Sequence, residues 1–255
     1  MKLKGILAAA SAIVALASGS AMATYSGQIW IPSTDVKGFK EVNISIDNYA
    51  RFSSKPDGAT GVSANTYDVG ITAGIIPLEK FKVEVGVDYI TDGGADSYAA
   101  KHPAYFNFKA GVPEDAFFKG MPAVAVGMYG LNTATAGDPA SSSTNVAYGL
   151  IAKTFPIIGR ISVGGYNGAE RSLGEKTNNG VLASWDRIMS EISDKLWLAV
   201  DYQGGKNFLG AVSVGGSWAF TPNVSLLLGA NVYNPGQTTL YGGKPTFTTQ
   251  LDLNF

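Results

Sequence analysis

The chain has 255 residues, of which 15% are charged and 11% are aromatic, and its formal net charge is −1. A soluble domain usually carries about 25% charged residues, so the composition does not favour an ordinary soluble protein. Cysteine is absent, which excludes disulfides, thiolate metal sites and cysteine nucleophiles. Nucleic acid is not an expected partner, because the sequence contains no basic patch with interleaved aromatic residues.

The N-terminus has the three parts of a secretory signal peptide. Residues 1–4 are basic, residues 5–17 are apolar, and residues 21–23 offer small side chains for cleavage. The apolar run is shorter than the ~18 residues that a spanning helix needs, so we expect residues 1–23 to be removed. An uncleaved helical anchor is the alternative. No later stretch of the sequence reaches that length, so a mature membrane protein with this sequence must cross the bilayer as a closed β-barrel.

Residues 24–40 are too apolar for an ordinary tail. They include Tyr25, the run from Ile29 to Pro32, and Phe39, and a disordered tail would not normally carry that many apolar side chains. The segment also lacks the alternation of a strand. We therefore expect it either to enter the barrel as a plug or to cover the periplasmic end as a cap, with the barrel following over residues 41–255.

From residue 41 onward, apolar and polar residues alternate over segments of about 9–11 residues, the length of a tilted membrane strand. The clearest pair is residues 65–75 and 81–89, joined by a turn centred on Leu78. The other expected strands are residues 41–50, 104–112, 123–129, 145–154, 160–167, 180–188, 196–203, 208–220, 224–233 and 246–255. About twelve strands result, an even number as in single-chain bacterial barrels.

The connections between these strands should alternate between short inner turns and longer outer loops rich in small and polar residues. Two connections depart from that rule. The inner connection at residues 113–122 is long, and its residues 114–119 could form a helical turn; the outer loop at residues 204–207 is very short. A soluble β-sandwich is the structural alternative, since alternation alone does not identify membrane strands.

The last expected strand carries the most specific pattern in the chain. Phe247, Thr249, Leu251 and Leu253 alternate with polar residues, and the sequence ends on Phe255. This resembles the closing strand of bacterial outer-membrane β-barrels, in which the terminal Phe serves as an assembly address. The resemblance implies an all-β, transmembrane, antiparallel up-and-down barrel of porin-like type.

The same resemblance implies a location and partners. The protein would be an integral protein of the outer membrane of a Gram-negative bacterium, exported through the cleaved signal peptide. It would contact outer-membrane lipid and lipopolysaccharide, and the barrel-assembly machinery would bind its C-terminal strand. Aromatic residues near the strand ends would form the membrane girdles; they are Tyr67, Phe81, Tyr89, Trp218, Phe220 and Phe255.

The opposite faces of the strands should line a lumen. The residues expected there are Asp47, Asp68, Lys82, Glu84, Asp88, Lys109, Lys153, Arg160, Asp201, Gln250 and Asp252. A hairpin centred on Leu78 sets Tyr67 opposite Tyr89 and Asp68 opposite Asp88, and directly facing like charges are destabilising. The acids of the first strands are therefore either a cation-attracting vestibule or solvated wall residues. Glu84 and Lys109 lie at similar heights on neighbouring strands and are expected to form a structural pair.

The size of the inward residues leaves two functions open. Small residues such as Ala147 and Gly149 favour a water-filled passage, although glycine can also relieve strain where strands bend. Tyr166, Trp197 and Tyr233 would fill the lumen if they point inward. We expect a narrow porin-like channel for passive passage of small solutes or ions; the alternative is a non-conducting barrel that serves as an anchor, receptor or structural envelope protein.

An enzymatic function is not expected. Outer-membrane hydrolases of this architecture depend on a histidine base, and the single histidine here, His102, precedes a proline in an expected outer loop. The acidic loop residues lack the spacing of a calcium-binding loop. The sequence therefore predicts no catalytic residues, no metal site and no cofactor.

Overall fold

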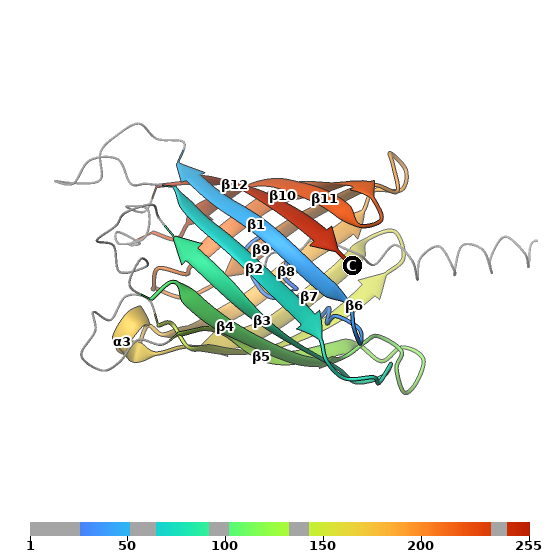
Figure 1. Cartoon of the computed structure of the whole chain (residues 1–255), viewed down its shortest axis with the longest axis horizontal. Helices are drawn as coiled ribbons and strands as arrows, with labels where there is room; N and C mark the ends of the chain where they lie inside the picture. The colour runs from blue at the N-terminus through green and yellow to red at the C-terminus, as the bar shows by residue number, and fades with distance from the viewer. Residues whose placement is uncertain (1–25, 52–64, 92–101, 133–142, 236–243) are drawn as a thin grey trace, which may run out of the picture.

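The computed structural model describes residues 26–51, 65–91, 102–132, 143–235 and 244–255. The signal peptide and most of the outer loops predicted from the sequence lie outside these residues. The described strands form one closed antiparallel barrel in which each strand pairs with its sequence neighbours and β1 pairs with β12. Figure 1 shows the strands inclined to the long axis and wrapped in a single layer. The predicted up-and-down barrel is confirmed, and the β-sandwich alternative is wrong.

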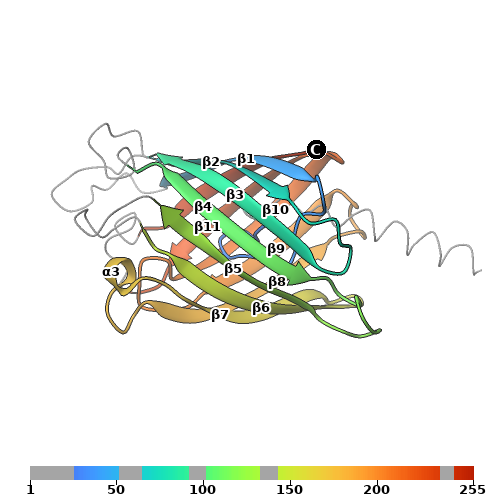
Figure 2. The same ribbon diagram turned by 60° about the horizontal axis from the view of Figure 1, so that its bottom comes forward.

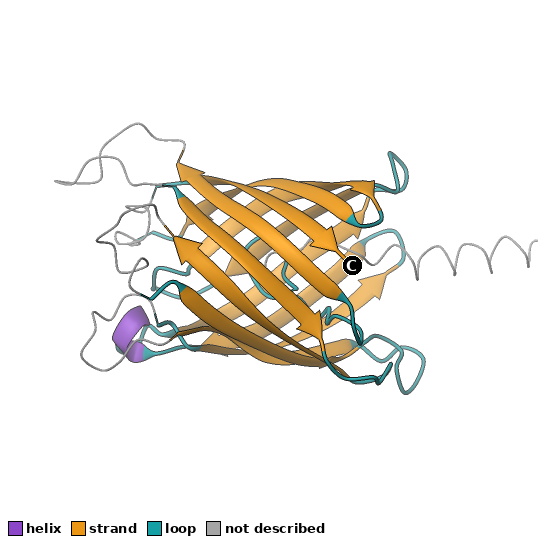
Figure 3. Ribbon diagram, viewed as in Figure 1, coloured by secondary structure: helices purple, strands orange, loops and turns teal. Residues whose placement is uncertain are grey.

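The barrel contains twelve strands. They are β1 (Val42–Arg51), β2 (Thr66–Gly74), β3 (Lys82–Thr91), β4 (Ala104–Val112), β5 (Ala123–Asn132), β6 (Val146–Phe155), β7 (Gly159–Asn167), β8 (Asn179–Ile188), β9 (Leu196–Gln203), β10 (Ala211–Thr221), β11 (Val224–Tyr233) and β12 (Thr246–Asn254). A four-residue helix, α3 (Glu170–Leu173), lies between β7 and β8 at one end of the barrel (Figure 3). No helix in the described part of the chain is long and apolar enough to cross a bilayer.

The side chains of the barrel have the reverse of the arrangement in a soluble protein. Along β12, Thr248, Gln250 and Asp252 are fully buried and point inward, whereas Leu251 and Leu253, which alternate with them, point outward. The same alternation exposes large apolar side chains over the outer surface of the wall. A strand with a period of two can have one polar and one apolar face, and here the polar face is the inner one.

The register of the β2–β3 hairpin differs from the predicted one by two residues. Tyr67 pairs with Thr91, Tyr89 with Val69, and Asp88 with Gly70, so the turn is centred on Glu79 rather than on Leu78. The predicted pairings of Tyr67 with Tyr89 and of Asp68 with Asp88 are therefore wrong. A shift of two residues keeps every side chain on its expected face, which is why the inward and outward assignments survive.

Gly74 explains where β2 ends. Its backbone bonds residues of the segment before β1: the Lys40 N–H donates to the Gly74 oxygen at 3.0 Å, and the Gly74 N–H donates to the Glu41 oxygen at 2.9 Å. A Cβ atom on Gly74 would lie only 1.9 Å from the carbonyl oxygen of Gly38. Only glycine permits this approach of two backbones.

The inner connection at residues 113–122 forms turns and no helix, so the helical turn suggested at residues 114–119 is absent.

Paired cysteines at Ile46 and Leu251 test the closure of the wall. The two residues are Cα partners across the β1–β12 pair, and facing residues of an antiparallel pair lie within the Cα separation of about 4.4–6.8 Å that a disulfide allows. Since the chain has no cysteine of its own, oxidation should give one intramolecular disulfide, detected by a mobility difference on non-reducing gels. Cysteines at Ile46 and Val200, which lies on β9, should stay reduced. A folded seam variant that resists oxidation would contradict the closure.

Candidate functional site

Residues 26–40, which we call the inner segment, run from the inside of the barrel to its inner mouth, and Figure 2 shows their blue trace behind the wall. Residues 26–34 are buried apart from the half-buried Trp30, whereas Phe39 and Lys40 are exposed. Gln28, Ile29 and Ile31 have no exposed surface. The Gln28 N–H donates to the Ile31 oxygen at 2.7 Å, and Gly27 pairs with Pro32. These bonds fold the segment into a tight turn with Ile29 and Trp30 at its tip. The described contacts of this turn are with the inner face of the barrel, and a role as a plug stays a prediction.

Glu84 and Lys109 hold one side of the inner segment. They are Cα partners on β3 and β4, and Lys109 Nζ lies 3.2 Å from Glu84 Oε1, so the predicted structural pair is confirmed. Glu84 also accepts hydrogen bonds from the Ser26 N–H at 3.1 Å, the Ser26 hydroxyl at 2.8 Å and the Lys37 N–H at 2.8 Å. Lys109 Nζ donates to the backbone oxygens of Ser26 and Asp35. The wall pair is therefore also an anchor for the segment.

Arg160, on β7, holds the other side. Its Nη1 lies 2.8 Å from both carboxylate oxygens of Asp35 in the inner segment, and its Nε lies 2.9 Å from Asp186 Oδ1 on β8. Asp186 also accepts hydrogen bonds from Gln28 Nε2 at 2.9 Å and Trp197 Nε1 at 3.2 Å. Burial would raise the pKa of the Asp35 carboxyl, but the Arg160 guanidinium beside it outweighs burial and holds that pKa below its usual value.

Asp201 and Gln250 bind the tip of the inner segment. Asp201 Oδ2 accepts the backbone N–H groups of Ile29 and Trp30, both at 2.8 Å, and Gln250 Nε2 donates to the Ile29 oxygen at 2.8 Å. The indole N–H of Trp30 donates to the Leu209 oxygen at 2.8 Å. Residues of β9 and β12 thus bind the tip from two parts of the wall.

Apolar contacts complete the fit of the tip. Ile29 packs against Trp197, Ala199 and Leu227. The ring of Trp30 meets Tyr49 and Tyr233 edge to face, with ring centroids 5.5 Å and 5.9 Å apart. Ile31 belongs to a larger buried cluster with Val146, Tyr148, Leu150, Tyr166, Leu173, Leu182 and Leu209. Tyr166, Trp197 and Tyr233 therefore point inward and help to fill the lumen.

The opposite part of the lumen carries four acids, Asp47, Asp68, Asp88 and Asp252, on the adjacent strands β12, β1, β2 and β3; we call this set the acidic wall. Asp47 is the direct Cα partner of Asp68. Two full negative charges about 5 Å apart repel by about 3 kcal/mol at an effective dielectric constant of about 20. The predicted pair of Asp68 with Asp88 is wrong, and Asp68 instead faces another like charge, that of Asp47.

The acidic wall is not a chelating site. Asn107 Nδ2 donates to Asp88 at 2.9 Å, and Asn43 Nδ2 donates to Asp252 at 3.2 Å. Among the residues that the structure describes, no group of three or more His, Cys, Asp or Glu side chains is arranged to hold a metal ion. The wall therefore concentrates negative charge without gathering it around one point.

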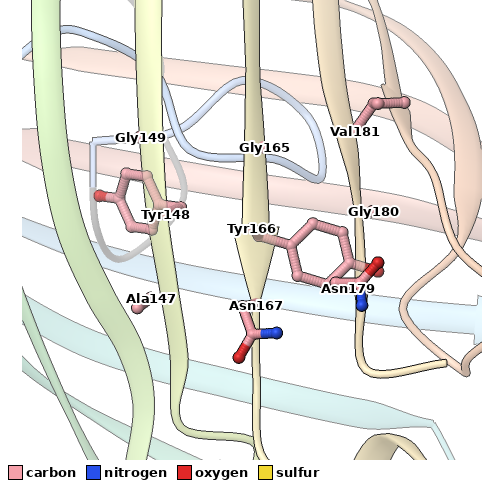
Figure 4. Close-up of a pocket in the computed structure, with 9 residues that line it drawn as sticks. All are labelled: Ala147, Tyr148, Gly149, Gly165, Tyr166, Asn167, Asn179, Gly180 and Val181. Carbon is pink, nitrogen blue, oxygen red and sulfur yellow. The ribbon is translucent and has the colours of Figure 1, made fainter. Parts of the chain in front are cut away.

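A hollow of about 620 Å³ lies over β6, β7 and β8 (Figure 4). Its outward-facing lining includes Ala147, Gly149, Gly165, Asn167 and Asn179, and Gly149 and Gly165 are direct Cα partners. A Cβ atom added at Gly149 would meet nothing nearer than 3.8 Å. The hollow is thus a dent in the outer surface where side chains are small.

No protein-family model matches the sequence, and the comparison with curated proteins finds no relative. Solved structures do match. A "KdgM porin" is 8% identical, with 84% of this chain and 99% of that chain covered and a TM-score of 0.54. The "COG4313 outer membrane channel from Pseudomonas putida F1" is 9% identical, with 87% and 97% covered and a TM-score of 0.51. The chain has the porin-like outer-membrane β-barrel fold. At these identities the likeness concerns the fold alone.

In this porin-like barrel, most of the residues predicted for the lumen lie on inward-facing positions of the strands. They are Asp47, Asp68, Glu84, Asp88, Lys109, Arg160, Asp201, Gln250 and Asp252. Lys82, half-buried, lies at the inner mouth beside Gly38 and Glu41 of the chain before β1. The residues predicted for the girdles, Tyr67, Phe81, Tyr89, Trp218, Phe220 and Phe255, are all exposed.

The structure corrects the predicted position of Lys153. It follows the outward alternation of β6, between the exposed Ile151 and Phe155, and pairs with Glu114 at 2.8 Å and Asp115 at 3.4 Å in the inner turn. The prediction that it lines the lumen is therefore wrong, because both faces of β6 are apolar and the sequence does not reveal which one is turned inward.

The same ambiguity reversed two other residues of β6. Ala147 and Gly149 point outward, while Val146, Tyr148 and Leu150 are buried inside the barrel. The small residues that favoured a passage at this strand therefore lie on the outer surface. This part of the lumen is filled by larger side chains.

Asp35 and Asp186 are two charged residues of the site that the sequence did not single out. Adjacent charges at Asp186 and Arg187 interrupt the alternation of polar and apolar residues in their strand. In the structure Asp186 is buried, whereas Arg187 turns outward and pairs with Glu191 at 2.9 Å. The available signal was the inward alternation that Asp186 shares with Ser184.

Replacing Arg160 with Met tests the anchor. The change leaves Asp35 and Asp186 without their cation in a largely buried place, so we expect the free energy of unfolding to fall by about 3 kcal/mol. Urea-induced unfolding in detergent or lipid measures it. Arg187→Met removes an exposed pair and should cost no more than about 1 kcal/mol. Equal losses in the two variants would contradict the anchoring role of Arg160.

Proposed function

We propose that the protein is an integral outer-membrane channel for the passive passage of small solutes or ions, and that the inner segment constricts its lumen. The porin-like fold and the apolar, aromatic-rich outer surface support the location. The inner segment, buried across the lumen, supports the constriction. Passage in this proposal requires the segment to be displaced or to shift within the lumen.

The observation that carries the proposal is the polar lining behind the inner segment. Both carboxylate oxygens of Asp47, the Ser45 hydroxyl and Gln250 Oε1 are buried without a hydrogen-bond partner among the described residues. Leaving a buried polar group unpaired costs about 1–3 kcal/mol. In a permanently filled lumen, the buried side chains would be apolar or fully hydrogen-bonded. If the inner segment moves, water can enter and form hydrogen bonds with these polar groups.

The second candidate is a non-conducting barrel used as an anchor, receptor or envelope-structural protein. The observation that favours it is the same inner segment, because ion pairs and hydrogen bonds hold it on both sides of the lumen. The two functions differ in whether the segment ever leaves its place, which electrical recording measures directly.

Deletion of residues 26–36 separates the two candidates. It removes the tip and the contacts of Ser26 and Asp35 with the wall but keeps residues 37–41, whose backbone bonds Glu84 and Gly74. In planar bilayers we expect discrete, small or infrequent current steps from the full chain and larger, longer openings from the deletion variant. Trp30→Ala, which shortens only the tip, should give a smaller increase.

Controls keep the result interpretable. Arg187→Met changes the outer face of β8 and should conduct like the full chain. Far-UV circular dichroism should show that the deletion variant retains its strands. A folded deletion variant that passes no current would rule out the channel and leave the non-conducting barrel.

A further inference from the structure

The lumen carries an excess of negative charge. On the strands that the structure describes, the inward-facing acids are Asp47, Asp68, Glu84, Asp88, Asp186, Asp201 and Asp252, and the inward-facing bases with described side chains are Lys82, Lys109 and Arg160. Lys109 pairs with Glu84, and Arg160 pairs with Asp186 and with Asp35 of the inner segment. These two bases therefore offset acids away from β12, β1 and β2, and among the described inward-facing side chains the acids outnumber the bases.

The oxygen atoms around Asp47 show where that charge is least compensated. Asp47 lies within electrostatic range of Asp68, Asp88 and Asp252. Its own carboxylate is fully buried, and neither oxygen has a hydrogen-bond partner among the described residues.

Two neutral neighbours of Asp47 add oxygen atoms in the same condition. Gln250 is the Cα partner of Asp47, and its Oε1 is buried and unpartnered. Ser45 is the Cα partner of Asp252, and its fully buried hydroxyl is also unpartnered. Carboxylate, amide and hydroxyl oxygens are the atoms that hard cations such as K⁺ and Na⁺ prefer.

The arrangement suits passage rather than retention. The acids occupy four strands of the wall and are not grouped to hold one metal ion. Conduction requires binding that is favourable enough for an ion to enter and weak enough for it to leave. Of the inward-facing bases with described side chains, Lys109 and Arg160 are already bonded to carboxylates, and Lys82 lies at the inner mouth.

We propose that the lumen conducts small monovalent cations in preference to anions, and that they pass along the acidic wall in contact with Asp47 and Asp68. This inference rests on the proposed channel function and names its substrate class. Negative charge focused in a low-dielectric passage raises the local concentration of cations and excludes anions.

Reversal potentials of the full chain in planar bilayers under a KCl gradient test the inference. We expect K⁺ to be more permeant than Cl⁻, and the preference to weaken in concentrated salt, as the Debye length falls from about 10 Å at 0.1 M to about 3 Å at 1 M. The double variant Asp47→Asn with Asp68→Asn should lower the K⁺/Cl⁻ permeability ratio several-fold. It should also fold at least as well as the parent, because it removes two facing like charges.

Two further variants locate the effect. Asp47→Glu keeps the charge and should keep most of the preference. Asp115→Asn removes a carboxylate from an inner turn, where it bonds the Gly120 N–H and Lys153, and should leave the ratio unchanged.

The outcomes distinguish the inference from the function on which it rests. Current steps without cation preference, or a double variant with the parent's permeability ratio, would overturn the inference and leave the channel standing. A full chain that never conducts, together with a silent deletion variant, would overturn the channel and the inference with it.

Discussion

Pairing of β1 with β12 is the constraint on which the rest of the structure depends. An open strand edge cannot persist in lipid, because each unpaired backbone group there costs several kcal/mol. Closing the sheet converts the alternation of side chains into an inside and an outside. It also places Gln250 and Asp252, near the end of the chain, beside Asp47 and Ser45, near the start of the barrel. The acidic wall is thus a product of closure.

Charge balance then accounts for how the inner segment lies within the lumen. A buried charge is costly unless it is paired, and the lumen-facing bases Lys109 and Arg160 lie on β4 and β7. The inner segment brings Asp35 and several backbone groups to those bases and their acidic partners. The described inward side chains of β12, β1 and β2 include acids and amides instead. Ion pairs and hydrogen bonds consequently hold the inner segment against β3, β4 and β7. On β12 and β1, the buried oxygen atoms of Gln250, Ser45 and Asp47 have no hydrogen-bond partner among the described residues.

Prediction from sequence succeeded where one face of a strand is clearly polar. The alternation of β12 and of β9 was enough to identify Gln250, Asp252 and Asp201 as inward residues. Prediction failed on β6, where Val146, Tyr148 and Leu150 alternate with Ala147, Gly149 and Ile151 and both faces are apolar. The register of β2 with β3 was also missed by two residues, because a shift of two keeps every side chain on its face and alternation alone does not distinguish the two registers.

The sequence by itself determined a closed barrel of about twelve strands, with a polar interior, because period-two alternation and the absence of a spanning apolar run leave a membrane chain few other solutions. Only the tertiary structure decided which residues meet inside. Asp47 faces Asp68, and Arg160 joins Asp35 to Asp186, through contacts that link positions up to 125 residues apart. Such pairings follow from register, closure and the path of the inner segment, which are set by the whole barrel and not by any local pattern.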